Sequence, residues 1–253
     1  MSFRPLITII IITSLSTIFS CSFLENEILP DSPKELLKEG IKALKLDQTL
    51  RGRELLSQLI EDFPDSKART HALLLLARSY YSYEEYEEAK VKFQKFIQLY
   101  PRHKNIDRAY FFKAMSDFKR VDLAKRDQTS TKEARKGFQD LIDQFPKSQY
   151  VEQAKQKKDV CDFQLAKHVL EVGKFYFRTG AYLSAISRFK SLMTDHPKQK
   201  FFDEAAFLLA ESHYHEQSLK EAFLLYKNFL SDYPRSPFSL EAKKRLIALR
   251  KKN

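Results

Sequence analysis

Small and large residues recur along the chain at fixed distances from five prolines. Each proline follows an aromatic residue or a histidine, at Phe63-Pro64, Tyr100-Pro101, Phe145-Pro146, His196-Pro197 and Tyr233-Pro234. Twelve positions earlier the residue is small, at Gly52, Ala89, Ala134, Ala185 and Ala222. Eight positions before the proline it is large (Leu56, Phe93, Phe138, Phe189, Tyr226), and eight after it is alanine (Ala72, Ala109, Ala154, Ala205, Ala242). Agreement at these columns in five blocks indicates an internal repeat.

The columns predict pairs of antiparallel helices. A small residue at a fixed place lets two helices approach closely, and the large residue one turn further on fills the space between them. Proline cannot continue a helix, so it ends each pair and turns the chain into the next. We therefore expect five helical hairpins. A bulky residue in an alanine column should cost roughly 1–3 kcal/mol through overpacking.

Local signals place the start of the helical region and its one irregular unit. The first helix should begin at Ser32-Pro33-Lys34-Glu35, a capping box with proline at the first helical position. The third unit is lengthened by residues 122–132, which we predict to be an exposed loop. Residues 32–146 then hold the first three repeats.

The second half, residues 147–253, should begin with an unusually long helix. The stretch from Tyr150 to Phe177 contains no helix breaker except Gly173, so one extended helix is expected to join the two halves. Two further repeats follow, and residues 238–251 are predicted to form a closing cap helix.

The repeat spacing resembles that of the tetratricopeptide family. The fourth unit matches the motif most fully, with Gly173, Tyr176, Gly180, Tyr182, Ala185, Phe189 and Pro197. The second unit carries Leu76, Ala77, Tyr80, Tyr86, Ala89, Phe93 and Pro101. The scarcity of glycine and the lack of alternating polar and apolar positions agree with this reading. The predicted fold class is all-α: a solenoid of five tetratricopeptide-like hairpins with a C-terminal cap helix.

Such solenoids present a concave groove lined by the first helix of each hairpin. In the tetratricopeptide pattern the lining positions are set relative to a small residue, here Ala77 and Ala114, and the resemblance implies a groove lined by Arg78, Tyr81, Arg108, Phe111, Met115, Phe118 and Lys119. Aromatic rings offer apolar contact, and Arg and Lys bind carboxylates or carbonyls. We therefore expect an extended peptide ligand with aromatic side chains and a free C-terminal carboxylate. The alternative is that several of these aromatics only pack between repeats.

The N-terminus has the pattern of a secretory signal. Arg4 precedes an apolar and hydroxylic run from Leu6 to Phe19, which at about 14 residues is short for a membrane span of about 20. Ile18-Phe19-Ser20-Cys21 resembles the lipobox of bacterial lipoprotein precursors, although Phe19 replaces the usual small residue. The resemblance implies removal of residues 1–20, acylation of Cys21 with chains such as palmitate, and a tether over residues 21–31. An ordinary signal peptide with an incidental Cys21 is the alternative.

Charge adds little to this picture. The net charge is +11 and falls to +10 once Arg4 is removed. Such an excess suits nucleic acid or an anionic membrane surface, and export argues against nucleic acid. The charges are mostly interleaved, as on exposed helix faces. The one plainly basic cluster is at the C-terminal end, with Lys243, Lys244, Arg245, Arg250, Lys251 and Lys252.

The chain has no pattern that predicts catalysis or a cofactor. His213 and His215 lie two apart and so point to different faces of a helix, whereas a metal pair needs a spacing of three or four. Together with Glu211 and Glu216 they are predicted to lie on a solvated face. Phosphate-binding loops, nucleophile elbows and clusters of metal ligands are absent. With Cys21 acylated, Cys161 has no partner for a disulfide and is expected to be a small core residue.

Two segments carry a more specific resemblance. One is the run from Tyr100 to Asp107, which contains Asn105-Ile106-Asp107. The other begins at Arg126-Asp127 and continues after the insert through Ala134, Phe138, Phe145-Pro146-Lys147-Ser148-Gln149-Tyr150 and Ala154. Together with the export signal, these segments resemble the BamD family of outer-membrane β-barrel assembly lipoproteins.

The resemblance implies a lipid-anchored scaffold in the outer membrane that faces the periplasm. Its first half would receive unfolded outer-membrane proteins, and its second half would dock the barrel-forming subunit and accessory lipoproteins. The alternative is a periplasmic tetratricopeptide adaptor for peptidoglycan or other envelope machinery. A glycan-processing enzyme would need paired catalytic carboxylates in a groove, and the sequence does not show them.

Overall fold

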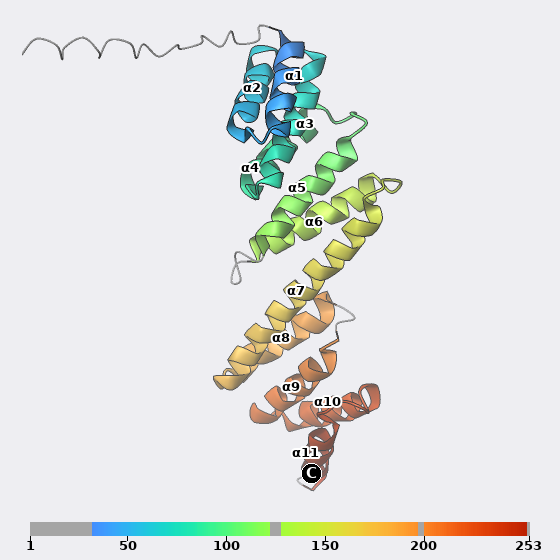
Figure 1. The fold of residues 1–253 in the computed structure, drawn as a ribbon. Helices are drawn as coiled ribbons and strands as arrows, with labels where there is room; N and C mark the ends of the chain where they lie inside the picture. The colour runs from blue at the N-terminus through green and yellow to red at the C-terminus, as the bar shows by residue number, and fades with distance from the viewer. Residues whose placement is uncertain (1–31, 122–127, 197–199, 252–253) are drawn as a thin grey trace, which may run out of the picture.

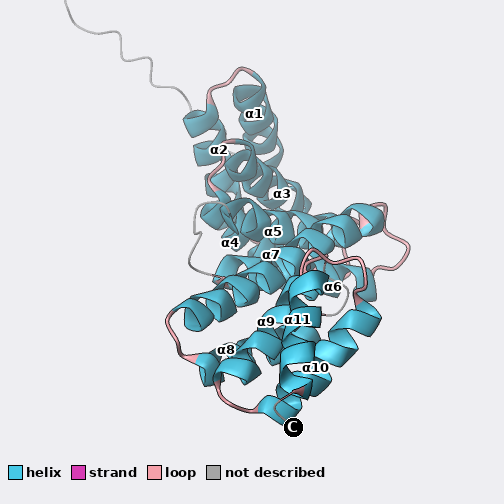
Figure 2. Cartoon of the chain, turned by 90° about the horizontal axis from the view of Figure 1, so that it is seen from below, coloured by secondary structure: helices cyan, strands magenta, loops and turns pink. Residues whose placement is uncertain are grey.

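The computed structural model describes residues 32–121, 128–196 and 200–251. These residues form eleven α-helices and no strand, which confirms the all-α prediction. Figure 2 shows them joined only by loops and turns. In chain order the helices are α1 (Pro33–Lys45), α2 (Thr49–Asp62), α3 (Lys67–Ser82), α4 (Tyr86–Leu99), α5 (Ile106–Arg120), α6 (Thr129–Gln144), α7 (Val151–Arg178), α8 (Tyr182–Asp195), α9 (Phe202–His215), α10 (Leu219–Asp232) and α11 (Ser239–Arg250). The predicted signal peptide, Cys21 and the tether all lie outside the described residues.

The helices pair into the five predicted hairpins, α1–α2 through α9–α10, and each helix packs mainly on its neighbours in sequence. Figure 1 shows the resulting elongated stack, with α1 at one end and α11 at the other. The repeat columns are the core of this stack. Every alanine of the columns is fully buried, and the large residues Leu56, Phe93, Phe138, Phe189 and Tyr226 are at most 2% exposed. The cap helix is confirmed at Ser239–Arg250.

The prolines end each hairpin as expected. The five residues that precede them are helix C-caps with φ between −125° and −131°. The ring of a proline excludes the preceding residue from helical φ and ψ, so the helix must end there. At the other end of the fold, the Ser32 side chain accepts a hydrogen bond from the Glu35 N–H, and Pro33 occupies the first turn of α1.

The turn inside a hairpin has its own signature. Asp47, Glu84, Gly180 and Gln217 each lie seventeen positions before a repeat proline, and each has a φ between 60° and 78°. Only glycine adopts this left-handed conformation without strain. The third hairpin has the inserted segment instead. That insert is shorter than predicted, because α6 begins at Thr129 and buries Ser130 and Thr131, so residues 129–132 are helix and not loop.

The long joining helix is confirmed as α7, with 28 residues. Its first part, with Val151, Ala154 and Cys161, packs into the core made by α5 and α6. Its later part, with Ala166 and Leu170, packs into the core made with α8 and α9. In Figure 1, α7 runs obliquely between the two halves of the stack. One continuous helix therefore belongs to both halves.

Candidate functional site

The predicted groove residues come from α3 and α5, which lie on the same side of the first half. Arg78 and Lys119 are exposed, while Tyr81, Arg108 and Phe118 are half-buried. These five side chains reach the surface and can contact a ligand.

Phe111 and Met115 do not line an open groove, and that part of the prediction is wrong. Phe111 is 3% exposed and Met115 is 7% exposed. The Phe111 ring stacks on Tyr150 at a centroid distance of 4.6 Å and also packs on Phe138. Tyr150 stands at the start of α7. The residue that precedes the next helix therefore covers this position, and the same stacking recurs at 4.9 Å between Phe207 and Phe238, the N-cap of α11.

Phe112 is the central aromatic residue of the surface, and the sequence pattern did not single it out. Its ring meets Tyr81 edge-on at 5.1 Å and stacks on Phe93 at 5.8 Å. The guanidinium carbon of Arg108 lies 5.8 Å from the centre of the same ring. Arg108, Phe112 and Tyr81 therefore form one continuous aromatic and cationic surface between α3 and α5. The only signal in the sequence was the pair of adjacent phenylalanines, of which the repeat pattern selected the wrong one.

The chemistry of this surface is that of a neutral phenol beside a fixed positive charge. Burial, with a smaller contribution from Tyr86, raises the pKa of Tyr81 to about 12. Its hydroxyl therefore stays protonated at neutral pH and can donate a hydrogen bond. Arg108 supplies a permanent charge, and an arginine fork can bind a carboxylate through two parallel hydrogen bonds.

A second part of the surface lies where α5 meets α7. Phe118 packs edge-on against Phe138 at 6.0 Å, and Lys157 of α7 places its ammonium group 5.0 Å from the centre of the Phe118 ring. Phe118 therefore offers a ligand an apolar ring close to the positive charge of Lys157. Lys119 beside it is exposed.

An ionic cluster around the buried Asp117 holds the helices beneath this surface in place. The ammonium nitrogen of Lys90 on α4 lies 2.7 Å from Oδ1 of Asp117 on α5 and also binds Glu133 on α6. Asp117 is 2% exposed. Burial raises the pKa of Asp117, whereas the hydrogen bond from Lys90 lowers the pKa of Glu133. This cluster links three helices at the end of the hairpin that carries the insert.

The two segments that carried the family resemblance meet in the fold. The Ser148 hydroxyl, in the turn between α6 and α7, donates a hydrogen bond of 2.6 Å to Asp107 at the start of α5. The same arrangement recurs between Ser236 and Asp203 at 2.7 Å. Both pairs attach the start of one helix to a turn one repeat later. Asp107 and Ser148 therefore have a structural role.

The second half departs from prediction at Glu211, which is not solvated. Its carboxylate is 6% exposed and accepts hydrogen bonds from Tyr226 and, at 2.9 and 3.1 Å, from Arg245. Arg245 is therefore not a free member of the C-terminal basic cluster. His215 is on the surface, as predicted, and stacks on Tyr182 at 4.8 Å.

The remaining polar groups of the described residues do not assemble into a reactive centre. Within that part of the chain, no group of three or more potential ligands is placed to hold a metal ion. Cys161 is fully buried, as predicted, and burial raises the pKa of its thiol to about 12. None of the described helices combines the length and the apolar character needed to cross a membrane.

Comparison with known families agrees with the family resemblance seen in the sequence. A family model described as YfiO, outer membrane lipoprotein, matches residues 30–221, more than half of the chain. The chain belongs to this family. Outer membrane protein assembly factor BamD of Caulobacter vibrioides is 26% identical over 237 residues, covering 90% of this chain and 78% of that protein. BamD of Rickettsia prowazekii is 27% identical, covering 77% of this chain and 79% of its own length.

The solved structures that match this chain are less similar to it in sequence. A tetratricopeptide protein of Thermus thermophilus gives a TM-score of 0.37 at 17% identity, covering 86% of this chain and 98% of its own. The TPR2AB domain of yeast Sti1 gives a TM-score of 0.42 at 16% identity, covering 86% and 83%.

Proposed function

We propose that this member of the YfiO family is a lipid-anchored scaffold subunit of the outer-membrane β-barrel assembly complex. It faces the periplasm and is held through Cys21. Its first half binds unfolded outer-membrane proteins, and its second half docks the barrel-forming subunit and accessory lipoproteins. The relatives named as outer membrane assembly factors support the assignment to this process.

The observation that carries the substrate-binding part is the surface formed by Tyr81, Arg108 and Phe112. It places an aromatic cluster beside a guanidinium, with exposed Arg78 nearby on α3. An unfolded membrane protein offers aromatic side chains and, at its end, a carboxylate. The aromatic rings fit the first and the arginines fit the second.

The test is a titration with a synthetic peptide that ends in phenylalanine with a free carboxylate. Charge reversal in Arg78→Glu plus Arg108→Glu should weaken binding about tenfold or more, since charge-assisted hydrogen bonds contribute about 1.5–3 kcal/mol each. The matched control is Arg188→Glu plus Arg235→Glu, two exposed arginines of the second half. The control should bind like the native chain. Unchanged affinity of the Arg78→Glu plus Arg108→Glu variant for the peptide would contradict the proposal that this surface binds the substrate.

The docking part needs a separate experiment. Affinity purification from detergent-solubilised envelopes should recover a large β-barrel protein with repeated periplasmic domains. Recovery of peptidoglycan enzymes alone would support an envelope adaptor instead. Mass spectrometry of the purified chain tests the anchor, because acylation of Cys21 adds the mass of the acyl chains.

A further inference from the structure

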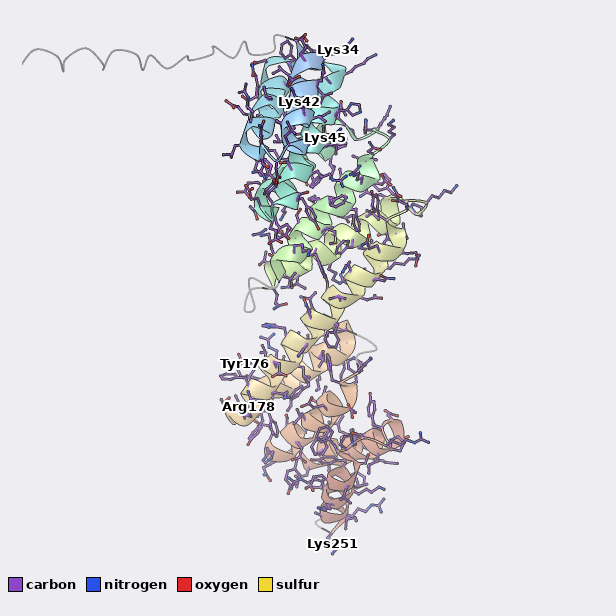
Figure 3. The ribbon with its side chains drawn as sticks, in the orientation of Figure 1. Lys34, Lys42, Lys45, Tyr176, Arg178 and Lys251 are labelled. Carbon is purple, nitrogen blue, oxygen red and sulfur yellow. The ribbon has the colours of Figure 1, made fainter. Side chains whose placement is uncertain are left out.

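The first helix carries a row of lysines on its outer side. Lys34, Lys38, Lys42 and Lys45, here called the lysine face, are all exposed. Their spacing of four, four and three residues aligns them along one side of a helix. Figure 3 shows Lys34, Lys42 and Lys45 following one another down α1. Lys42 pairs with Glu39 at 3.3 Å, whereas the other three make no ion pair within the described part of the chain.

The same hairpin exposes large apolar side chains where α1 turns into α2. Leu46 is 59% exposed, Leu50 is 83% exposed and Tyr83, on the next hairpin, is 49% exposed. We call these three residues the leucine tip. The Tyr83 hydroxyl donates a hydrogen bond to Asp47, which places the tyrosine beside the turn that carries the leucines. Leu46 directly follows Lys45, so the leucine tip begins at the end of α1 where the lysine face ends.

This combination favours a bilayer surface over water. Lysines attract anionic headgroups and can extend their ammonium groups toward them while their stems cover apolar surface. Exposed leucines and a tyrosine gain by entering the boundary between headgroups and acyl chains. An acidic protein segment would bind the lysines but would offer no apolar surface to cover the exposed leucines.

The position of the surface in the chain points the same way. Ser32, the N-cap of α1, lies eleven positions after Cys21. Extended chain spans at most about 3.3–3.6 Å per residue, so an acylated Cys21 holds α1 within about 40 Å of the bilayer. The helix nearest to the anchor is the one with the lysine face.

We propose that the lysine face and the leucine tip form a membrane-contact surface that binds the anionic headgroups of a phospholipid bilayer. This inference rests on the lipid anchor of the proposed function, because the anchor brings α1 within reach of the membrane. Contact through α1 fixes the orientation of the first hairpin on the bilayer, which acyl chains on Cys21 alone do not.

The test measures binding to lipid vesicles by co-sedimentation, using the chain from Ser22 onward. This chain contains every described helix but lacks Cys21, so its binding is independent of acylation. It should bind vesicles of phosphatidylglycerol and phosphatidylethanolamine, and bind pure phosphatidylcholine vesicles far more weakly. The variant Lys34→Glu, Lys38→Glu, Lys45→Glu should bind the anionic vesicles at least about 100-fold more weakly, since each lysine near such a surface contributes about fivefold.

Two controls separate this surface from general charge. Lys132→Glu, Lys136→Glu, Lys147→Glu changes three exposed lysines on α6 and in the turn after it by the same total charge, and this variant should bind like the native chain. Leu46→Ser plus Leu50→Ser should weaken binding about tenfold, through loss of apolar burial. Equal binding by the native chain and the α1 lysine variant overturns the inference, as does equal binding to both kinds of vesicle. The peptide titration and the mass of Cys21 remain separate measures of the proposed function.

Discussion

Gly173 shows how closely two helices meet in this fold. A Cβ at this position would lie 2.6 Å from Cε1 of Phe189, a residue that is fully buried. Gly173→Val should therefore lower the free energy of unfolding by about 2 kcal/mol, within the range for overpacking. Urea denaturation followed by circular dichroism measures the change. Adding Phe189→Leu should recover part of the loss, and an equal loss in the double variant would mean that the ring is not the cause.

Tyr226 makes stability depend on alkaline pH. It is fully buried, and burial, followed by its hydrogen bond to Glu211, raises its pKa far above the usual value. Its contribution is complete below pH 10, where the unfolded tyrosine is also neutral. Above that pH only the unfolded chain releases this proton, so the free energy of unfolding should fall by about 1.4 kcal/mol per pH unit for this residue.

Urea denaturation at several pH values between about 9 and 11.5 measures that slope, since a normal tyrosine titrates near pH 10. Tyr226→Phe removes the titrating group, so the free energy of unfolding of this variant should fall less steeply with pH, by about 1.4 kcal/mol per pH unit. Its stability at pH 7 should also be lower, because Glu211 loses a hydrogen-bond donor. An identical slope in native and variant chains would contradict the assignment.

At the scale of elements, α11 is held by one partly buried ion pair as well as by apolar contacts. Arg245 reaches Glu211 of α9 through two hydrogen bonds and lies 4.7 Å from the ring of Tyr214. Arg245→Met leaves the Glu211 carboxylate buried without its cation and should cost about 2 kcal/mol, less than a fully buried pair because Arg245 is partly exposed.

Hydrogen exchange should localise that loss. Amides of α9, α10 and α11 should exchange faster in Arg245→Met, while those of α1 to α4 should not change. Lys244→Met is the matched control, because Lys244 pairs only with Glu241 at the surface. Arg245→Met with Glu211→Gln should recover part of the stability, since the double variant leaves no buried charge. Faster exchange throughout the chain would contradict a local role.

The elements themselves could be predicted because their packing is encoded in short spacings. The small residue, the large residue and the proline of each repeat lie within twelve positions, and each helps to pack or end one hairpin. Contacts between distant residues left no such signal. Arg53 is buried and donates to Ser79 and Glu85, which lie 26 and 32 residues later. Likewise, Glu211 appeared solvated because its partner Arg245 is on a helix two elements later.

The candidate surface was predicted only in part, for a related reason. Arg78, Tyr81, Arg108, Phe118 and Lys119 reach the surface because their place on the first helix of a hairpin determines their side. The burial of Phe111 and Met115 depends on contacts with other helices, such as the stacking of Phe111 on Tyr150 39 residues later, and the short spacings of the repeat do not encode such contacts. Whether the exposed residues bind a peptide is a matter for the titration.

At the scale of the whole molecule, stability should be local. Helices contact mainly their neighbours in sequence, as in other solenoids. Leu56→Ala in the first repeat removes a fully buried side chain and should cost about 2–5 kcal/mol. Hydrogen exchange of α1 to α4 should accelerate strongly, while α9 to α11 should keep their protection. Equal acceleration at both ends would show that the chain unfolds as one cooperative unit.

The length of α7 has a geometric consequence for the two ends of the molecule. With 28 residues it is about 42 Å long, and core residues of the first and second halves, Cys161 and Ala166, lie five positions apart on it. Each residue of an α-helix adds about 1.5 Å of length and about 100° of rotation. A residue inserted between Cys161 and Ala166 would therefore shift and rotate the second half by these amounts relative to the first. Two added residues would turn its surfaces almost to the opposite side, whereas seven would return them to within about 20° of their original phase. The angular relation between the candidate surface of α3 and α5 and the surfaces of the second half is thus set by the number of residues in one helix.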